Sequence, residues 1–358
     1  FLSADLFNLY VTLELLGLSA VALTALGGKR ESIRAALRYL LVGLLGSLGY
    51  LVGVAILYTA YGTLDTQQVG ARIGADPASA VALLLMTAGL LLKTALFPLH
   101  FWLPAAHSNA PPPVSAALSA LVVKAGFYLV LRLWTEVFPQ AVSPHAAMLL
   151  GLLGCAAILW GSWQALQAQR LKLLAAYSTV AQLGYLFVGL MLLVMSPEGP
   201  TRELVFGALM LMALTHGFAK SSLFLAIGVV QQHAGHDRID QLDGTAQRLP
   251  ATTFAIALAG VALIGLPPSG AFLGKWHLLA TAIDFGQWLL VLVMGIGSLL
   301  AAAYVFRVLG HAFGNRAFAS RSVNFAIAEW PALALGMIAT LGLGLGSVWL
   351  WDFLGVTS

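Results

Sequence analysis

The stretch at residues 90–132, LLLKTALFPLHFWLPAAHSNAPPPVSAALSALVVKAGFYLVLR, determines how the chain folds. It holds two apolar runs that carry one lysine each, Lys93 and Lys124, and a proline-rich corner beginning near Pro98 separates them. An apolar run of about 20 residues is long enough to cross the hydrocarbon core of a bilayer. Because an ammonium group inside such a run is costly, the stretch indicates membrane helices whose charges serve a function.

The composition agrees with a protein that lies mostly inside a membrane. The chain is 60% hydrophobic and 9% charged, with a mean hydropathy of +0.90. Soluble domains contain about 25% charged residues, so this chain lacks the charge that a water-facing surface needs. The apolar runs do not alternate as barrel strands do. One cysteine, Cys155, lies in an apolar run, which excludes a disulfide framework.

The hydrophobic runs predict an all-α polytopic membrane protein with about ten transmembrane segments. We expect them at residues 6–26, 37–61, 79–103, 114–134, 145–163, 171–195, 204–230, 253–283, 288–306 and 330–351. The eighth is too long for one straight span and contains the sequence LPPSG at 266–270. It therefore predicts two half-helices around a break.

The basic residues of the loops alternate from one side to the other. One set of ends holds Lys29, Arg30, Arg34, Arg38, Arg170, Lys172, Arg238, Arg248, Arg307, Arg316 and Arg321, and the opposite ends hold Arg72, Arg132 and Arg202. This bias predicts that the basic loops are cytoplasmic and that the last residues lie on the opposite side. We expect the membrane to be the inner membrane of a prokaryotic cell. The largest polar loop, 233–249, contains His233 and His236, but a solvated connector is favoured there over a metal site.

Five ionisable residues remain inside the expected spans: Glu14, Lys93, Lys124, Lys220 and Lys275. Each costs roughly 2.5–3.5 kcal/mol near a helix centre, so the five together match or exceed the roughly 5–15 kcal/mol that stabilises a typical domain. A structural explanation is that Glu14 pairs with one lysine and the others bond to backbone carbonyls. One glutamate cannot neutralise four ammonium groups, however, and exchange of protons by the lysines is favoured.

Both expected helix breaks lie near one of these lysines. Pro98 follows Lys93, and Pro267 and Pro268 precede Lys275. A proline inside a helix removes a backbone hydrogen bond and crowds the preceding turn. Non-helical backbone at membrane depth is tolerated only where it is buried in protein or faces water, and transporters use such breaks for ion sites. A simple kink is the alternative for either position.

Further polar residues follow helical faces. His216 and Lys220 are one turn apart, which favours neither a relay nor a simple hydrogen-bonding role for the histidine. Ser178, Gln182 and Tyr185 form a polar stripe on an otherwise apolar helix, and His277 lies close to Lys275. His100 and His107 flank the first proline corner, where they could pass protons from the basic side.

Several chemistries have no sequence signature here. The chain contains no phosphate-binding loop, dinucleotide fingerprint, cysteine cluster or HExxH motif. We therefore expect no cofactor, no metal and no nucleic-acid partner, and no redox chemistry or nucleotide hydrolysis on this chain itself.

The opening stretch resembles the central signature of the antiporter-like subunits of respiratory complex I, Mrp-type cation/proton antiporters and membrane-bound hydrogenases. Three later runs, LKLLAAYSTVAQLGY, HGFAKSSLFLAIG and GLPPSGAFLGK, resemble that family's signatures in the same order. The resemblance implies about fourteen helices with two inverted five-helix repeats, each with one broken helix. Since the chain starts at Phe1, the first four helices would be missing. The repeats would divide it at 1–135, 136–315 and a last helix at 316–358.

The resemblance also implies roles for individual residues. Glu14 and Lys93 would form an ion pair, Lys124 would be a central proton carrier, and Lys275 would be the terminal one. His216 and Lys220 would connect the last two. The chain departs from the family pattern at Ala105, where aspartate is frequent, and at 164–169, which lack a frequent acidic residue.

Three functions remain open at this stage. The first is a proton-translocating subunit of a multisubunit complex, coupled to quinone-linked electron transfer on other subunits. The second is an Mrp-type Na⁺/H⁺ antiporter subunit without electron transfer. The third is a structural membrane anchor. The expected partners are other membrane subunits, lipids, and protons or Na⁺.

Overall fold

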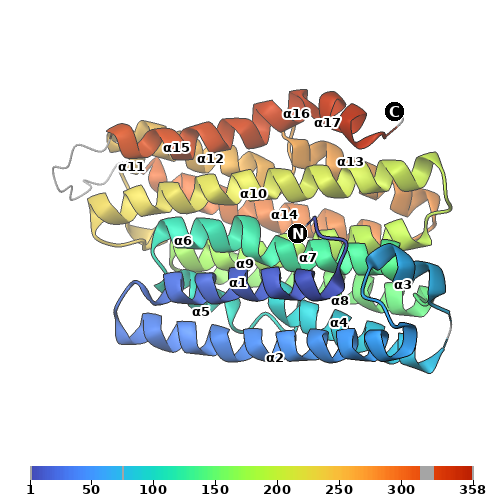
Figure 1. Cartoon of the computed structure of the whole chain (residues 1–358). Coiled ribbons are helices and arrows are strands. Elements are labelled where there is room, and N and C mark those ends of the chain that lie inside the picture. Colours follow the sequence, from blue (N-terminus) through green and yellow to red (C-terminus); the bar gives the residue numbers. More distant parts are fainter. Residues whose placement is uncertain (1, 75, 315–325, 357–358) are drawn as a thin grey trace.

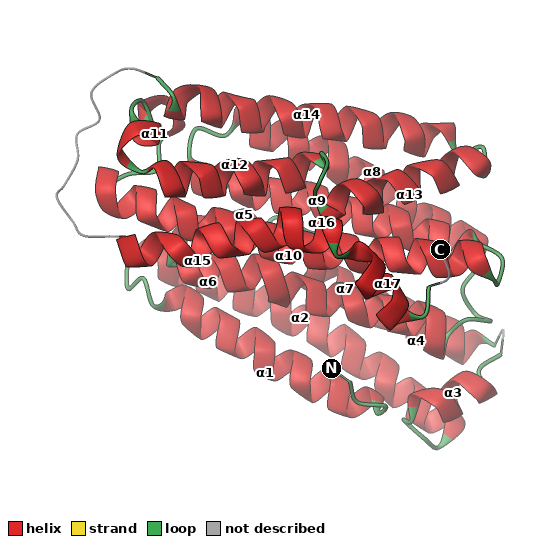
Figure 2. Cartoon of the chain, turned by 90° about the horizontal axis from the view of Figure 1, so that it is seen from above, coloured by secondary structure: helices red, strands yellow, loops and turns green. Residues whose placement is uncertain are grey.

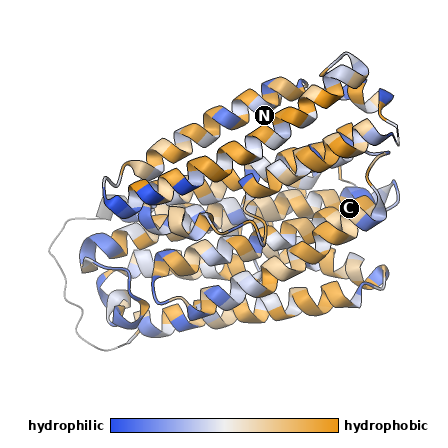
Figure 3. Cartoon of the chain, turned by 90° about the horizontal axis from the view of Figure 1, so that it is seen from below, coloured by the Kyte–Doolittle hydropathy of each residue, from blue (hydrophilic) through white to orange (hydrophobic). Residues whose placement is uncertain are grey.

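The computed structural model describes residues 2–74, 76–314 and 326–356, which form one bundle of helices running roughly side by side (Figure 1). The hydropathy pattern explains this arrangement. Figure 3 shows apolar residues along the middle of the bundle and hydrophilic residues at its two ends, as expected for helices that cross a membrane. Arg316 and Arg321 lie outside the described residues.

The first part of the chain contains two long helices and a broken one. The elements are α1 (Leu6–Ala25), α2 (Arg30–Tyr61), α3 (Thr66–Arg72), α4 (Pro77–Thr94), α5 (Leu103–Asn109), α6 (Pro112–Ala117) and α7 (Val123–Arg132). A π-helical turn at Leu118–Val122 joins α6 to α7, and a second one follows α7 at Leu133–Val137.

The remaining elements continue the bundle. They are α8 (Pro144–Gln167), α9 (Leu171–Met195), α10 (Pro200–Ala234), a 3₁₀ turn (Ile239–Gln241), α11 (Thr245–Arg248), α12 (Pro250–Ile264), α13 (Gly270–Asp284), α14 (Trp288–Ala312), α15 (Ala326–Met337), a π turn (Ile338–Gly342), α16 (Leu343–Leu345) and α17 (Ser347–Leu354).

The all-α membrane architecture is confirmed. Within the described residues, 8 helices are long and apolar enough to cross a membrane, and Glu329–Leu345 with Ser347–Leu354 form a further span bent by 68°. The expected eighth segment is divided into α12 and α13. Several boundaries differ from expectation, and two of them are the following. The helix expected from residue 37 begins at Arg30, and the segment expected at 79–103 stops being helical after Thr94.

Close approach of backbones holds the bundle together at two places. A Cβ on Gly89 of α4 would lie 2.2 Å from the carbonyl oxygen of Gly46 on α2. A Cβ on Gly184 of α9 would lie 2.4 Å from the carbonyl oxygen of Gly154 on α8. Small residues allow membrane helices to pack this tightly.

Helix α9 occupies the centre of the bundle. Nearly all of its residues from Leu171 to Leu193 are buried, and its neighbours include α5, α8, α10 and α14. Figure 2 shows α9 enclosed between α8 and α10. Polar groups on this helix are therefore shielded from both lipid and water.

Candidate functional site

The first half of each broken helix ends in a left-handed residue, which lies two or three residues before the proline. Helix α4 ends at Thr94, and Ala95 has φ 55°. Helix α12 ends at Ile264, and Gly265 has φ 83°. A left-handed residue after the last helical turn is a common way to stop a helix. The breaks expected at Pro98, Pro267 and Pro268 are therefore present, and the second one leaves backbone carbonyls that Lys275 contacts.

The charged pair lies between α1, α2 and α4. Lys93 Nζ donates to Glu14 Oε1 at 2.6 Å, with side chains 9% and 17% exposed. The Ser47 hydroxyl on α2 donates to the same carboxylate oxygen. The Lys93 ammonium group lies beside Gly17 of α1, where an added Cβ would be 3.5 Å from Nζ, an ordinary contact distance. The structure thus brings together the pair that the sequence predicted.

Lys124 follows the π turn between α6 and α7. Its Nζ donates to the carbonyl of Ser119 at 2.5 Å. The Ser119 hydroxyl is buried and pairs with the hydroxyl of Thr179 on α9 at 2.8 Å. On its other side, Lys124 lines a largely apolar cavity of about 820 Å³ between α7 and α10.

Lys220 on α10 is completely buried against α9. Its Nζ donates to the carbonyl of Ala175 at 2.7 Å and to the Ser178 hydroxyl. The same carbonyl accepts a bond from the Thr179 hydroxyl at 3.0 Å. Oxygens on α9 therefore link the surroundings of Lys220 to those of Lys124 through Ser119.

Lys275 on α13 reaches back to the break that precedes it. Its Nζ donates to the carbonyls of Leu263 at 3.2 Å and Ile264 at 3.0 Å, which the end of α12 leaves free. It also lies 3.3 Å from the Ser298 hydroxyl and 4.1 Å from the centre of the Tyr185 ring. These contacts agree with the structural explanation for this lysine, because they satisfy its donors without a carboxylate.

Helix α9 contacts both Lys220 and Lys275. The predicted stripe of Ser178, Gln182 and Tyr185 points toward the lysines: Ser178 contacts Lys220, and the Tyr185 ring lies under Lys275. Gln182 Nε2 donates at 2.8 Å to the carbonyl of Leu263, which Lys275 also contacts. One helix therefore carries polar groups that contact two of the buried lysines.

His216 lies one turn before Lys220 and is buried. Neither of its ring nitrogens has a hydrogen-bond partner among the described residues. Two other expected histidines pack on aromatic rings: His277 lies 5.0 Å from Trp351, and His100 lies 5.4 Å from Phe97. Of these three histidines, His216 is the one that lies one helical turn from a buried lysine on the same helix. The other two make the ring contacts just described.

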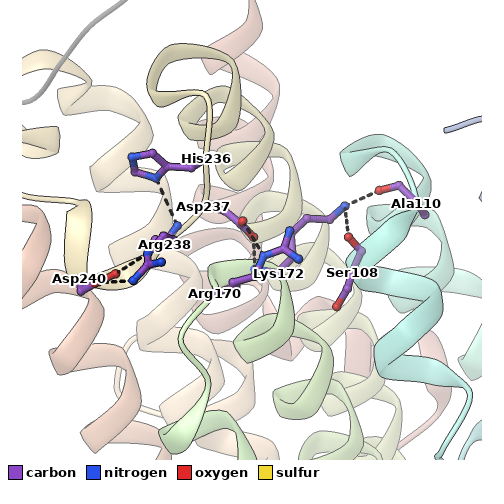
Figure 4. A network of polar contacts seen from close by, with 8 residues as sticks. All are labelled: Ser108, Ala110, Arg170, Lys172, His236, Asp237, Arg238 and Asp240. Atoms are coloured by element: carbon purple, nitrogen blue, oxygen red, sulfur yellow. Dashed lines mark hydrogen bonds and ion pairs between the residues drawn. The ribbon is translucent and has the colours of Figure 1, made fainter. Parts of the chain in front are cut away.

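The end of the bundle that carries most of the loop lysines and arginines is called the basic end. There, polar contacts join the start of α9 to the loop after α10 (Figure 4). Arg170 Nε donates to Asp237 Oδ1 at 2.9 Å, and Asp237 accepts the backbone N–H of Lys172 at 3.2 Å. Further along the loop, the Arg238 guanidinium hydrogen-bonds to Asp240 and lowers the pKa of that carboxyl group. Asp240 is exposed, so this pair belongs to the solvated surface.

Glu14–Lys93, Lys124, Lys220 and Lys275 are called the line below. The chemical character of the line follows from the hydrogen-bond partners of its lysines. Among the described residues, one lysine of the line has a carboxylate partner, and that is Lys93 with Glu14. Lys124, Lys220 and Lys275 contact neutral oxygens. Neutral oxygens stabilise an ammonium group less than a carboxylate does, so these lysines are suited to accept and release protons.

Sequence reasoning missed Ser119, Thr179 and the carbonyl of Ala175. The clearest available signal was the position of Thr179 beside Ser178 in the polar stripe. Ser119 lies five residues before Lys124, a spacing that faces the lysine only because the intervening turn is π-helical.

Comparison with known proteins identifies the family. The family described as "NADH:quinone oxidoreductase/Mrp antiporter, TM" matches residues 3–301 of the chain. The chain belongs to this family. It is 38% identical over 357 residues to an NADH-quinone oxidoreductase subunit of Desulforudis audaxviator, covering 96% of this chain and 69% of that protein. It is 27% identical over 359 residues to a Na(+)/H(+) antiporter subunit of Bacillus subtilis, covering 98% and 70%.

Solved structures place the fold in the same family. A chain of the Mrp complex from a Dietzia species superimposes with a TM-score of 0.89 at 27% sequence identity, covering 99% of this chain and 74% of that one. The family includes membrane subunits of two kinds of multisubunit ion-translocating complex, and this chain is similar to both.

Proposed function

We propose that the chain is a proton-translocating subunit of a multisubunit membrane complex, driven by quinone-linked electron transfer on other subunits. The observation that supports this most is the buried line of Glu14–Lys93, Lys124, Lys220 and Lys275, in which the last three lysines donate hydrogen bonds to neutral oxygens and to no carboxylate among the described residues. His216 would serve as a carrier beside Lys220, because its two ring nitrogens are free to bind and release protons.

Protons would enter from the basic end toward Lys124 or Lys220, move along the line, and leave past Lys275. A cavity of about 460 Å³ beside Lys275, lined by Trp276 and Ser298 among others, supports an opening at that end. The Glu14–Lys93 pair would act as a gate. When the pair is closed, Glu14 offsets the charge of Lys93. When it opens, the uncompensated charge of Lys93 repels a proton on Lys124.

The proposed topology puts the basic loops in the cytoplasm of a prokaryotic cell and the last residues on the opposite side. We also propose two repeats, at 1–135 and 136–315, followed by a last helix. The order of helices supports this: a 32-residue helix precedes the first break, and a 35-residue helix precedes the second. Within each proposed repeat, one span follows the broken helix: Pro112–Val137 in the first and Trp288–Ala312 in the second.

The test uses the assembled complex in sealed vesicles, with electron transfer and proton movement measured together. Lys124→Ala and Glu14→Ala are expected to abolish proton movement while the complex still assembles, because each removes a group that holds or gates the proton. Lys29→Ala, at an exposed site at the basic end, is the control and should pump normally. Unchanged pumping in Lys124→Ala or Glu14→Ala would exclude the relay.

Na⁺/H⁺ antiport is the second candidate, favoured by the similarity to the Bacillus subtilis antiporter protein and the Dietzia complex. It differs in needing no electron donor. Vesicles containing the complex are given an imposed pH gradient and then Na⁺. Na⁺-dependent loss of the gradient without any donor supports antiport, whereas donor-dependent acidification that is independent of Na⁺ supports the first proposal.

A further inference from the structure

Lys172 is a buried cation that the line described above does not include. It is the second residue of α9 and is 3% exposed. Figure 4 shows its side chain reaching from α9 to the end of α5, where Nζ donates to the carbonyls of Ala110 and, at 3.4 Å, Ser108. Asp237 contacts its backbone N–H, and the exposed Arg170 binds that same carboxylate. Lys172 thus lies just below the solvated surface of the basic end.

The residue next to these carbonyls is an unusual histidine. His107 on α5 is 0% exposed, and neither ring nitrogen has a hydrogen-bond partner among the described residues. A buried polar atom without a partner is costly, by about 1–3 kcal/mol. The ring stacks on Phe224 of α10 with centroids 4.9 Å apart. Phe224 is one helical turn after Lys220, so His107 lies between the contacts of Lys172 and the region of Lys220.

We propose that Lys172 and His107 are the entry carriers through which protons pass from the basic end to Lys220, an inference that rests on the proposed proton translocation. The Lys172 ammonium group gives a proton to a ring nitrogen of His107 and is reloaded from the surface. The His107 imidazolium then gives a proton to the neutral amine of Lys220. No bond other than N–H forms or breaks, and each carrier returns to its starting state.

The side chains of Lys172 and His107 are suited to proton transfer because they lack partners that would hold their protons in place. His107 can accept a proton on either ring nitrogen because no hydrogen bond within the described residues fixes its tautomer. Lys172 is held by carbonyl oxygens rather than by a carboxylate side chain at Nζ, so release of its proton separates no direct ion pair. A purely structural alternative is that Lys172 only clamps α5 to α9 and that His107 only fills space against Phe224.

Two substitutions separate the alternatives in the assembled complex. His107→Phe keeps the aromatic contact with Phe224 and removes two unpartnered nitrogens, so a structural histidine predicts equal or higher thermal stability with normal pumping. Lys172→Arg keeps a cation that can bond to carbonyls but does not give up its proton. If Lys172 and His107 carry protons, each variant loses about tenfold or more of the proton-uptake rate, with assembly retained.

The controls also separate this inference from the proposed function. Arg307 is another cation that donates to carbonyls at the same end, those of Leu166 and Ala168, so Arg307→Lys should leave the uptake rate unchanged. Lys124→Ala measures the line itself. If Lys124→Ala stops pumping while His107→Phe and Lys172→Arg pump normally, the entry carriers are excluded and the relay stands. If Lys172→Arg does not assemble, the uptake rate of His107→Phe decides alone.

Discussion

At the scale of single residues, the two helix breaks use the same backbone conformation with different side chains. Ala95 is the one non-glycine residue with positive φ in the described part of the chain. Gly265 is the corresponding residue at the second break. The left-handed conformation costs roughly 1–2 kcal/mol for a residue with a Cβ. At the second break glycine serves a further purpose, because the Lys275 side chain passes directly over it.

Gly265→Ala should therefore disturb Lys275 as well as the backbone. An added Cβ would lie 2.8 Å from Cδ and 3.4 Å from Nζ of Lys275, so the lysine side chain must shift, and we expect this to weaken its hydrogen bonds to the carbonyls of Leu263 and Ile264. We expect a loss of several-fold in proton movement and lower thermal stability of the complex. Gly286→Ala is the matched control: its φ is +64° and nothing lies within 4 Å, so it carries only the backbone strain. Equal transport in the two variants would contradict this role of Gly265.

The charged members of the line could be predicted from the sequence, but their partners could not. A lysine in an apolar run is recognisable because a charged side chain inside the bilayer costs free energy on any of the helices. Serine and threonine are common in membrane helices, and whether Ser119 meets Thr179 depends on how α6–α7 packs on α9. The carbonyl of Ala175 leaves no signal at all, since every residue has one. The roles assigned to these lysines and to His216 remain predictions.

At the scale of helices, the Glu14–Lys93 pair depends on how closely α2 and α4 approach. Gly89 lies one turn before Lys93, and Gly46 precedes Ser47, which bonds to Glu14. Gly89→Ala would place a Cβ 2.2 Å from the Gly46 carbonyl oxygen, so the two helices must separate. We expect about 1–3 kcal/mol of destabilisation, seen as a lower unfolding temperature, together with slower proton movement.

Gly43→Ala on α2 tests whether this effect comes from the contact or from glycine itself. Nothing lies within 4 Å of a Cβ at Gly43, and alanine favours helix over glycine by about 1 kcal/mol. The control should be neutral or slightly stabilising. If Gly89→Ala behaves like Gly43→Ala, the close packing of α2 on α4 does not position the ion pair.

The sequence predicted the helices better than their local irregularities. All ten expected segments correspond to helices, because long apolar runs are a strong signal. The start of α2 at Arg30 was missed because arginines extend a helix beyond the bilayer as readily as they end one in a loop. The π turn at Leu118–Val122 has no proline or glycine within it to mark it, yet it sets the spacing between Ser119 and Lys124.

At the scale of the whole molecule, α9 makes the line a series of connected sites. It contacts Lys220 through Ala175 and Ser178, and Gln182 meets the carbonyl that Lys275 also contacts. In a series, every carrier is required for each proton. In two independent paths, each carrier moves only the protons of its own path. A membrane anchor needs no proton carriers at all.

The double substitution Lys124→Met with Lys275→Met distinguishes these three cases. Methionine keeps most of the length and removes a buried charge, so assembly should be unaffected or slightly improved. For carriers in series, each single variant already stops nearly all proton movement, and the double variant is no slower than the slower single one. For two independent paths, each single variant keeps part of the rate and only the double variant loses it all, as expected when effects at separate sites add. Normal proton movement by the double variant, measured in vesicles beside intact electron transfer, would mean that the lysines are structural and the chain is an anchor.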